Sequence, residues 1–339
     1  MSDPLEQQQP FQPPPTPPQP VAPVEGERPT KIRPFAIGLF ALGLITMVLA
    51  ILKTISIEVF SGVALCVFGM LLFGLSFIRL PVIPNADEAP IPGFQKVLGV
   101  FYEPTRIFRN LRVHPYWIAA FVVIVLLNVI YLNAFIRRVT PERIATHMTD
   151  KMSEMGPPFA PPAEMLADIK ARQIDQLSKP TQRVGAAFST IGGTFIWGTV
   201  VSAVSLLLIL AFGGRINFWQ ALAIYFYTLL PVVIVQKILS LVILYIKAPE
   251  DLHPVLGQDN LVQDNLGVLF LPSEHPVLFV MTSFIGVLSL YGLWLRAKGL
   301  KEGGTRVGST AGWGVAITLW VVGLLLVTVV TALFPGFIG

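Results

Sequence analysis

Seven long apolar stretches constrain this chain more than any other feature of its sequence. A helix needs about 20 residues to cross a hydrocarbon core of about 30 Å, and the stretches of roughly that length cover residues 35–52, 57–78, 116–136, 187–212, 218–246, 277–295 and 312–334. The chain is 53% hydrophobic and only 13% charged, whereas a soluble domain carries about 25% charged residues. Since the backbone in lipid must satisfy its own hydrogen bonds, the sequence predicts an all-α, polytopic transmembrane bundle of about seven spans.

The spacing of these stretches divides the chain into four regions. Residues 1–34 are predicted to be a Pro/Gln-rich disordered tail in the cytoplasm, because clustered prolines favour extended polyproline II. Residues 35–79 form a two-span helical hairpin with a very short connection. Residues 80–115 form a linker and a basic amphipathic interfacial helix. Residues 116–335 form a five-span domain with a polar helical loop at 137–185.

The amphipathic stretch carries apolar and basic residues on different faces. Pro104 suits the first position of a helix, after which the apolar residues Ile107, Phe108 and Leu111 share one face and the basic residues Arg106, Arg109 and Arg112 lie along another. This pattern is typical of a helix in the lipid headgroup layer, with the arginines on anionic headgroups. The alternative is a core helix of a soluble subdomain, for which the sequence offers no soluble partner.

The polar loop at 137–185 is predicted to form a helical hairpin. Thr140 and Pro141 are suited to begin a helix, whose apolar face carries Ile144, Met148, Met152 and Met155. A second helix follows a proline-rich turn and carries Met165, Leu166, Ile169 and Leu177. Methionine-rich faces adapt to varied partners, so this loop and the Pro-rich tail are the candidate docking sites for unknown protein partners. Simple packing on the bundle is the alternative for the loop.

Charge in the late loops predicts the orientation. The loop after Lys247 carries five acidic residues and no lysine or arginine up to residue 275, whereas Lys298, Lys301 and Arg306 make the last loop basic. Since basic loops stay in the cytoplasm, we expect the N-terminus inside and the C-terminus outside. We expect this membrane to be a bacterial inner membrane.

The sequence offers no catalytic site, cofactor or metal. The four histidines lie far apart along the chain, the only cysteine is Cys66, and no predicted span contains a histidine or an aspartate. Metal sites and nucleophile–base pairs need clustered groups of these kinds. No basic run with interleaved aromatics is present to bind nucleic acid. The chain is therefore predicted to be non-enzymatic.

Polar residues inside the spans mark one candidate intramembrane site. Lys237 lies in the fifth stretch next to Gln236 and beyond Pro231, and Glu58 and Asn128 lie in the second and third stretches. Ionisable groups in membranes often mark function, so Lys237 and Pro231 indicate an alternative function as a small-solute or lipid transporter. The simpler interpretation is that the Lys237 side chain extends to the outer interface.

Three short motifs lie in the second half of the chain. They read HPYWI at 114–118, NFWQALAIYFYTLLP at 217–231 and NLGVLFLP at 265–272, with a basic loop before the last span. Over residues 94–334 the chain resembles the Yip-domain (Ypt/Rab-interacting protein) family, in its prokaryotic branch. The residues that carry the resemblance are Pro115, Trp117, Tyr227 and Pro231.

The resemblance implies an inside N-terminus, an outside C-terminus and a role in membrane organisation, curvature or scaffolding. It does not imply Rab binding, because residues 111–114 do not match the Asp-Leu-Tyr-Gly element of the eukaryotic branch. The hypothesis is a non-enzymatic membrane scaffold that binds anionic lipid and protein partners. Homo-oligomerisation is left open.

Overall fold

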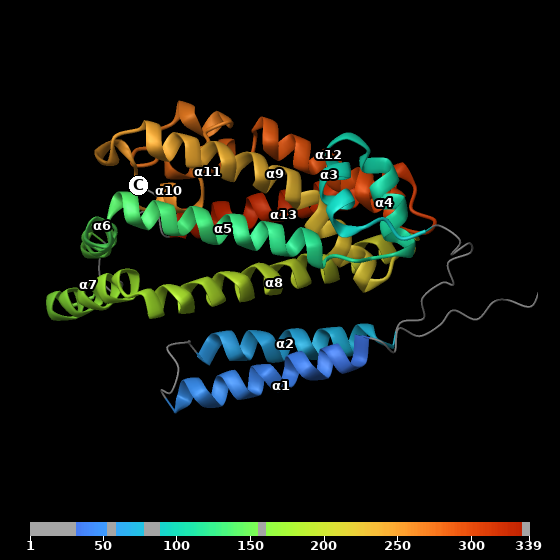
Figure 1. The fold of residues 1–339 in the computed structure, drawn as a ribbon, viewed down its shortest axis with the longest axis horizontal. Helices are drawn as coiled ribbons and strands as arrows, with labels where there is room; N and C mark the ends of the chain where they lie inside the picture. Colours follow the sequence, from blue (N-terminus) through green and yellow to red (C-terminus); the bar gives the residue numbers. More distant parts are fainter. Residues whose placement is uncertain (1–31, 53–58, 78–88, 155–160, 334–339) are drawn as a thin grey trace, which may run out of the picture.

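The computed structural model describes residues 32–52, 59–77, 89–154 and 161–333, and its regular elements there are helices (Figure 1). In chain order they are α1 (Ile32–Ile51), α2 (Val59–Leu75), α3 (Gly93–Tyr102), α4 (Pro104–Val113), α5 (Ile118–Val139), α6 (Pro141–Ser153), α7 (Ala163–Ser178), α8 (Pro180–Ala211), α9 (Phe218–Ile246), η1 (Pro249–Asp251), α10 (Leu256–Asp259), η2 (Leu266–Leu269), α11 (Pro276–Ser283), α12 (Val287–Gly303) and α13 (Ser309–Leu333). The predicted all-α class is confirmed.

In the part of the chain that the structure describes, five helices are long and apolar enough to cross a membrane. These segments are Arg33–Ile51, Ile118–Val139, Ile191–Ala211, Phe218–Ile246 and Ser309–Leu333. Helix α2 has 17 residues and the predicted sixth stretch is interrupted, so the count of seven spans is not confirmed. The long helices run side by side along the longest dimension of the molecule, with α3 and α4 at one end and α6 and α7 at the other (Figure 1).

The predicted sixth span is two helices, α11 and α12, with a break at residues 284–286. At a helix break, backbone N–H and C=O groups lose their helical hydrogen bonds, and leaving them unpaired in an apolar environment costs free energy. The loop before α11 provides their partners: the Asp264 carboxylate accepts from Leu288 N at 2.7 Å, and Leu266 N donates to Ile285 O at 3.0 Å. Helix α12 also continues to Gly303, so the lysines expected in the last loop are helical.

Helix α9 is the centre of the bundle. Its first half is buried almost all round, because α5, α8 and α12 each pack against it. Its start is fixed by a capping box in which the Asn217 side chain accepts from Gln220 N and the Gln220 side chain accepts from Asn217 N. The helix continues through Pro231, which is buried. The chain therefore builds its core around one long apolar helix.

The apolar face of α4 lies against protein. Ile107, Phe108 and Leu111 are buried, and α4 packs chiefly on α12. Glycines in α12 make room for this contact: a Cβ at Gly299 would lie 3.1 Å from the Phe108 ring. The expectation that this face lies in lipid is therefore wrong, because α12 extends beyond its predicted end and covers it.

The polar loop folds as the expected helical hairpin. Helix α6 begins at Pro141, and α7 packs beside α6 and α8. Ile144 is buried in a small cluster with Tyr131 and Phe135 of α5, and Met148 packs against that cluster. Met155 lies outside the described residues. None of the residues of α7 is buried, so this helix presents most of its surface outward.

Helices α1 and α2 approach closely through small residues. A Cβ added at Gly43, Gly62 or Gly69 would lie 2.7–2.8 Å from a backbone nitrogen of the facing helix. Glycines of this kind allow backbone contact between membrane helices, where hydrophobic exclusion from water no longer acts. The hairpin meets the bundle through Phe35, whose ring lies 5.1 Å from that of Trp219.

Gly69→Leu should open this hairpin, because a larger side chain meets the backbone of α1, and overpacking typically costs about 1–3 kcal/mol. Cys66 is the only cysteine and lies half-buried in the same interface, with its thiol donating to Phe40 O at 3.7 Å. A thiol-reactive dye in a thermal ramp therefore reports on the hairpin directly. We expect the midpoint of dye labelling to fall in Gly69→Leu.

The matched control is Gly74→Leu, since a Cβ at Gly74 meets nothing within 4 Å. This variant should keep the wild-type midpoint. Equal midpoints in all three proteins would contradict the close packing of α1 on α2.

Candidate functional site

Basic side chains from four segments gather at one end of the bundle. They are Arg106 and Arg109 of α4, Arg215 before α9, Lys301 of α12 and Arg306 after it, and all five are exposed. A two-residue bridge joins two of these segments: Arg215 N donates to Thr305 O at 2.9 Å and Thr305 N donates to Arg215 O at 2.6 Å. Residues distant in sequence thus form one surface, which we call the basic end.

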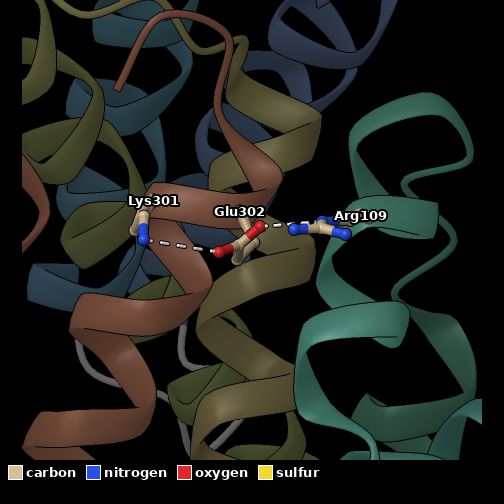
Figure 2. A network of polar contacts seen from close by, with 3 residues as sticks. All are labelled: Arg109, Lys301 and Glu302. Carbon is tan, nitrogen blue, oxygen red and sulfur yellow. Dashed lines mark hydrogen bonds and ion pairs between the residues drawn. The ribbon is translucent and has the colours of Figure 1, made fainter. Parts of the chain in front are cut away.

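A charged network orders the centre of the basic end (Figure 2). Arg109 Nε lies 2.9 Å from Glu302 Oε2, and Lys301 Nζ lies 3.7 Å from Glu302 Oε1. Glu302 is largely covered, whereas Arg109 keeps 59% of its side chain exposed. Exposed ion pairs contribute at most about 1 kcal/mol. The network therefore orients Arg109 on α12 while more than half of the Arg109 side chain stays exposed.

The three arginines predicted to contact headgroups are not equivalent. Arg106 is exposed and pairs with Glu103 at 3.0 Å within α4. Arg112 is half-buried, and its buried Nε has no hydrogen-bond partner among the described residues. Its carbonyl accepts from the Gln220 side chain at 2.6 Å, which ties the end of α4 to the start of α9. Arg106 and Arg109 are therefore the accessible pair.

Lys237 lies in a polar cluster between α5, α9 and the loop that follows α9. Its side chain is 9% exposed, its ammonium donates to the carbonyl of Asp259, and it lies 4.6 Å from the centre of the Tyr131 ring. The Tyr131 hydroxyl donates to the Gly257 carbonyl, and Ser240 Oγ accepts from Leu261 N at 2.9 Å. Side chains of two long helices thus fix the path of residues 257–261.

The other residues of the predicted intramembrane site were expected to lie with Lys237, but the described ones among them are not its partners. Gln236 and Asn128 are half-buried, and the described partners of Lys237 are Tyr131 and Asp259 instead. Glu58 lies outside the described residues, so its place in the candidate site stays a prediction. Lys237 extends toward the loop as a snorkelling side chain would, but its ammonium ends on protein.

The family-motif residues lie in the aromatic core. The Trp117 ring stacks on the Phe226 ring of α9 at 5.6 Å and lies 5.5 Å from the Phe195 ring of α8. The Phe226 ring in turn lies 5.2 Å from the Phe121 ring of α5. Tyr227 is fully buried, and its hydroxyl has no hydrogen-bond partner among the described residues. Pro231 is buried one turn further along α9, and Pro115 is half-buried in the turn before α5. These residues contribute packing at the α5–α9 contact.

A histidine pair lies at the end opposite to the basic end. The rings of His147 in α6 and His253 after η1 are 4.9 Å apart. His253 Nδ1 accepts from Val255 N at 3.2 Å and from Leu256 N at 3.1 Å. Arg143 donates to three carbonyls of the adjoining turn, those of Pro249, Glu250 and Leu252. These contacts attach α6 to the loop after α9.

Sequence patterns missed the partners that matter most. The partner of Arg109 is Glu302, and the partners of Lys237 are Tyr131 and Asp259, each more than 20 residues away along the chain. In the sequence, only the position of Glu302 next to Lys301 is visible as a charge pattern. Among the described residues there is no group of three or more His, Cys, Asp or Glu that could bind a metal ion. The described chemistry is ionic and hydrogen-bonding.

Lys237→Leu should destabilise the protein, because it removes a hydrogen bond to a charged donor, an interaction that contributes about 1.5–3 kcal/mol. Loss of the ammonium also leaves the Asp259 carbonyl without this donor. We expect a lower thermal midpoint in detergent and faster hydrogen exchange in residues 256–262. Gln236→Leu, at the half-buried neighbouring position, is the control and should keep wild-type exchange. Tolerance of Lys237→Leu would mean that the cluster contributes little.

Acidification should weaken the attachment of α6 to the loop after α9. Burial lowers the pKa of His147 and of His253 below the ordinary 6.5, with further lowering of the His253 pKa by His147, Lys151 and Arg143. Lys151 and Arg143 also lower the His147 pKa, which Asp150 and Glu154 oppose. The unfolded state then binds more protons than the folded state. The contribution of the two neutral histidines to the free energy of unfolding is fully present above pH 6.5 and is lost as the pH falls below that value.

The measurement is the thermal midpoint in detergent from pH 7.5 to pH 5. An asparagine can accept from backbone N–H groups two residues further on and does not titrate in this range. The midpoint of His253→Asn should therefore fall less on acidification than that of the wild type. Parallel curves for the two proteins would contradict a contribution from His253.

Comparison with known proteins identifies the family. None of the curated proteins and none of the solved structures matches the chain. The model of the Yip1 domain matches residues 98–330, a segment that runs from α3 to α13 and includes the basic end, the Lys237 cluster and the aromatic core. Because this match covers well over half of the 339 residues, the chain belongs to the Yip1 domain family of membrane proteins.

Proposed function

We propose that this protein is a non-enzymatic membrane scaffold that binds anionic lipid headgroups at its basic end and recruits protein partners. The observation that carries the proposal is the gathering of five exposed basic side chains from four segments on one end of a membrane bundle. Basic residues at an anionic membrane surface each contribute about 1 kcal/mol of attraction. Arginine also pairs well with phosphate oxygens because its donors form a planar fork.

Family membership supports the absence of catalysis. Yip1-domain proteins are a membrane-trafficking family and are not known as enzymes. The contacts of Arg109 with Glu302, of Gln220 with Arg112 and of Lys237 with Asp259 connect helices and loops to one another, as expected of a structural bundle.

The basic end is proposed to face the cytoplasm of a bacterial inner membrane. This assignment rests on the preference of Lys and Arg for the cytoplasmic side. Helix α1 begins beside the start of α9, where Phe35 meets Trp219, so the N-terminus would lie on the same side. Helix α13 runs away from the basic end, which would place the C-terminus outside.

Protein partners are proposed to dock on the α6–α7 hairpin or on the Pro-rich tail. Met165 of α7 is 54% exposed, and an exposed methionine adapts to varied surfaces. The tail at residues 1–31 lies outside the described residues. Transport at Lys237 and Pro231 is not carried forward, because Lys237 donates to the chain itself and Pro231 is buried in the core.

The test is lipid binding by the full chain with Arg106 and Arg109 both replaced by Gln. Loss of two charges removes about 2 kcal/mol of attraction, which corresponds to roughly 30-fold weaker binding. Native mass spectrometry of detergent-solubilised protein, titrated with phosphatidylglycerol, measures the apparent Kd of the first bound lipid. We expect the double variant to show a weaker Kd by about that factor.

Arg137→Gln is the matched control, because Arg137 is exposed at the opposite end of α5. It should change the Kd by less than about twofold, since a single exposed charge far from the site contributes little. Titration with phosphatidylcholine reports the contribution of neutral lipid. Unchanged phosphatidylglycerol binding in the double variant would overturn the proposal.

A further inference from the structure

Helix α3 has the reverse of the usual distribution of polar and apolar residues. Its lysine, Lys96, is fully buried, whereas Phe94 and Tyr102 are 74% and 70% exposed. Leu98 and Phe101 lie between them on the same face, because residues three, four and seven apart share one side of a helix. These four residues form an exposed apolar row. No described element of the chain covers this row.

The buried side of α3 is anchored to the start of a membrane span. Lys96 Nζ donates to the carbonyl of His114 at 2.9 Å and lies 5.3 Å from the centre of the Tyr116 ring. A Cβ at Gly93 would lie 2.9 Å from the Cβ of Ala119, in the first turn of α5. Helix α3 therefore lies at the level where α5 begins.

The span next to the exposed apolar row also has exposed apolar residues where it begins. Ile118 and Val122 of α5 are exposed, and so is Tyr116 just before it. In a membrane span, exposed apolar side chains face lipid, and aromatic residues concentrate at the boundary between headgroups and acyl chains. Helix α3 meets the start of this span at Gly93, directly before Phe94, the first residue of the row. Lipid is therefore the partner whose chemistry fits the row and whose position is set by the neighbouring span.

The basic residues of α4 lie next to the row in sequence. Helix α3 ends at Tyr102, and α4 begins at Pro104 and carries Arg106 and Arg109 outward. An interfacial helix combines an apolar face in the acyl boundary with basic residues at headgroup level. Here the two properties are divided between two consecutive helices: α3 supplies the apolar face and α4 the charge.

We propose that α3 is a membrane-inserted interfacial helix whose apolar row, Phe94, Leu98, Phe101 and Tyr102, lies in the acyl boundary of the leaflet at the basic end. The identity of that leaflet as anionic rests on the proposed function. Insertion itself depends on apolar area, so it also takes place in a neutral bilayer. The buried Lys96 fixes the rotation of α3 about its axis and thereby points the row outward.

The test uses the full chain with Cys66→Ala, reconstituted in phosphatidylcholine vesicles and in vesicles with added phosphatidylglycerol. A nitroxide is attached to a cysteine introduced by Leu98→Cys or, independently, by Phe101→Cys. Relaxation by oxygen, which concentrates in lipid, is compared with relaxation by a water-soluble nickel chelate. The lipid reference is Leu126→Cys on the exposed face of α5, and the water reference is Gly308→Cys, where a Cβ meets nothing within 4 Å.

Both α3 labels should have more access to oxygen and less access to nickel than the Gly308→Cys label, in the direction of the Leu126→Cys label, in both kinds of vesicle. Nickel access equal to that at Gly308→Cys would overturn the proposal, since the row would then face water. Dipolar broadening between labels of different molecules would also overturn it, because a second copy would then cover the row.

The two proposals fail separately in these measurements. If the labels lie in lipid while the Arg106 and Arg109 double variant binds phosphatidylglycerol as the wild type does, the insertion stands and the scaffold's anionic-lipid site fails. If the labels face water while the double variant loses lipid, the headgroup site stands and the insertion fails.

Discussion

The enclosure of α9 is the constraint on which the rest of the bundle depends. A helix that is apolar on every side must be covered on every side by protein or lipid, and the first half of α9 is covered by protein. The neighbouring spans α5, α8 and α12 take these positions. Small residues allow their approach: Gly198 of α8 fits against Phe226, and Gly299 of α12 fits against Ile224. The second half of α9 is more open and reaches the Lys237 cluster.

The two ends of the bundle differ in how their loops are attached. At the basic end, α4 packs on α12, and the attachment is an apolar contact with one ordered ion pair above it. At the other end, backbone carbonyls of the loop after α9 accept from Tyr131, Arg143 and Lys237. The first arrangement leaves Arg106 and Arg109 exposed, whereas in the second Arg143 and Lys237 donate to the chain itself. This contrast supports the proposal that anionic lipid binds at the basic end.

Sequence patterns predicted the elements whose signals are local. The start of α9 at Phe218 agrees with the predicted apolar stretch at 218–246, and the starts of α4 and α6 follow from their prolines. The position of the apolar face of α4 was not predictable, because its helical period is the same whether lipid or α12 covers it. The role of Lys237 depends on a carbonyl 22 residues away, and hydropathy carries no information about such a contact.

The same limit explains the break between α11 and α12. Hydropathy continues across residues 284–286, but the backbone there pairs with Asp264 and Leu266 of the preceding loop. This arrangement has a consequence for biosynthesis. The α11–α12 pair is not an autonomous insertion unit, because its central peptide groups depend on a segment outside it. That segment precedes α11 in the chain, so translation delivers the partner before the groups that need it, and the polypeptide can close this helix break as it emerges.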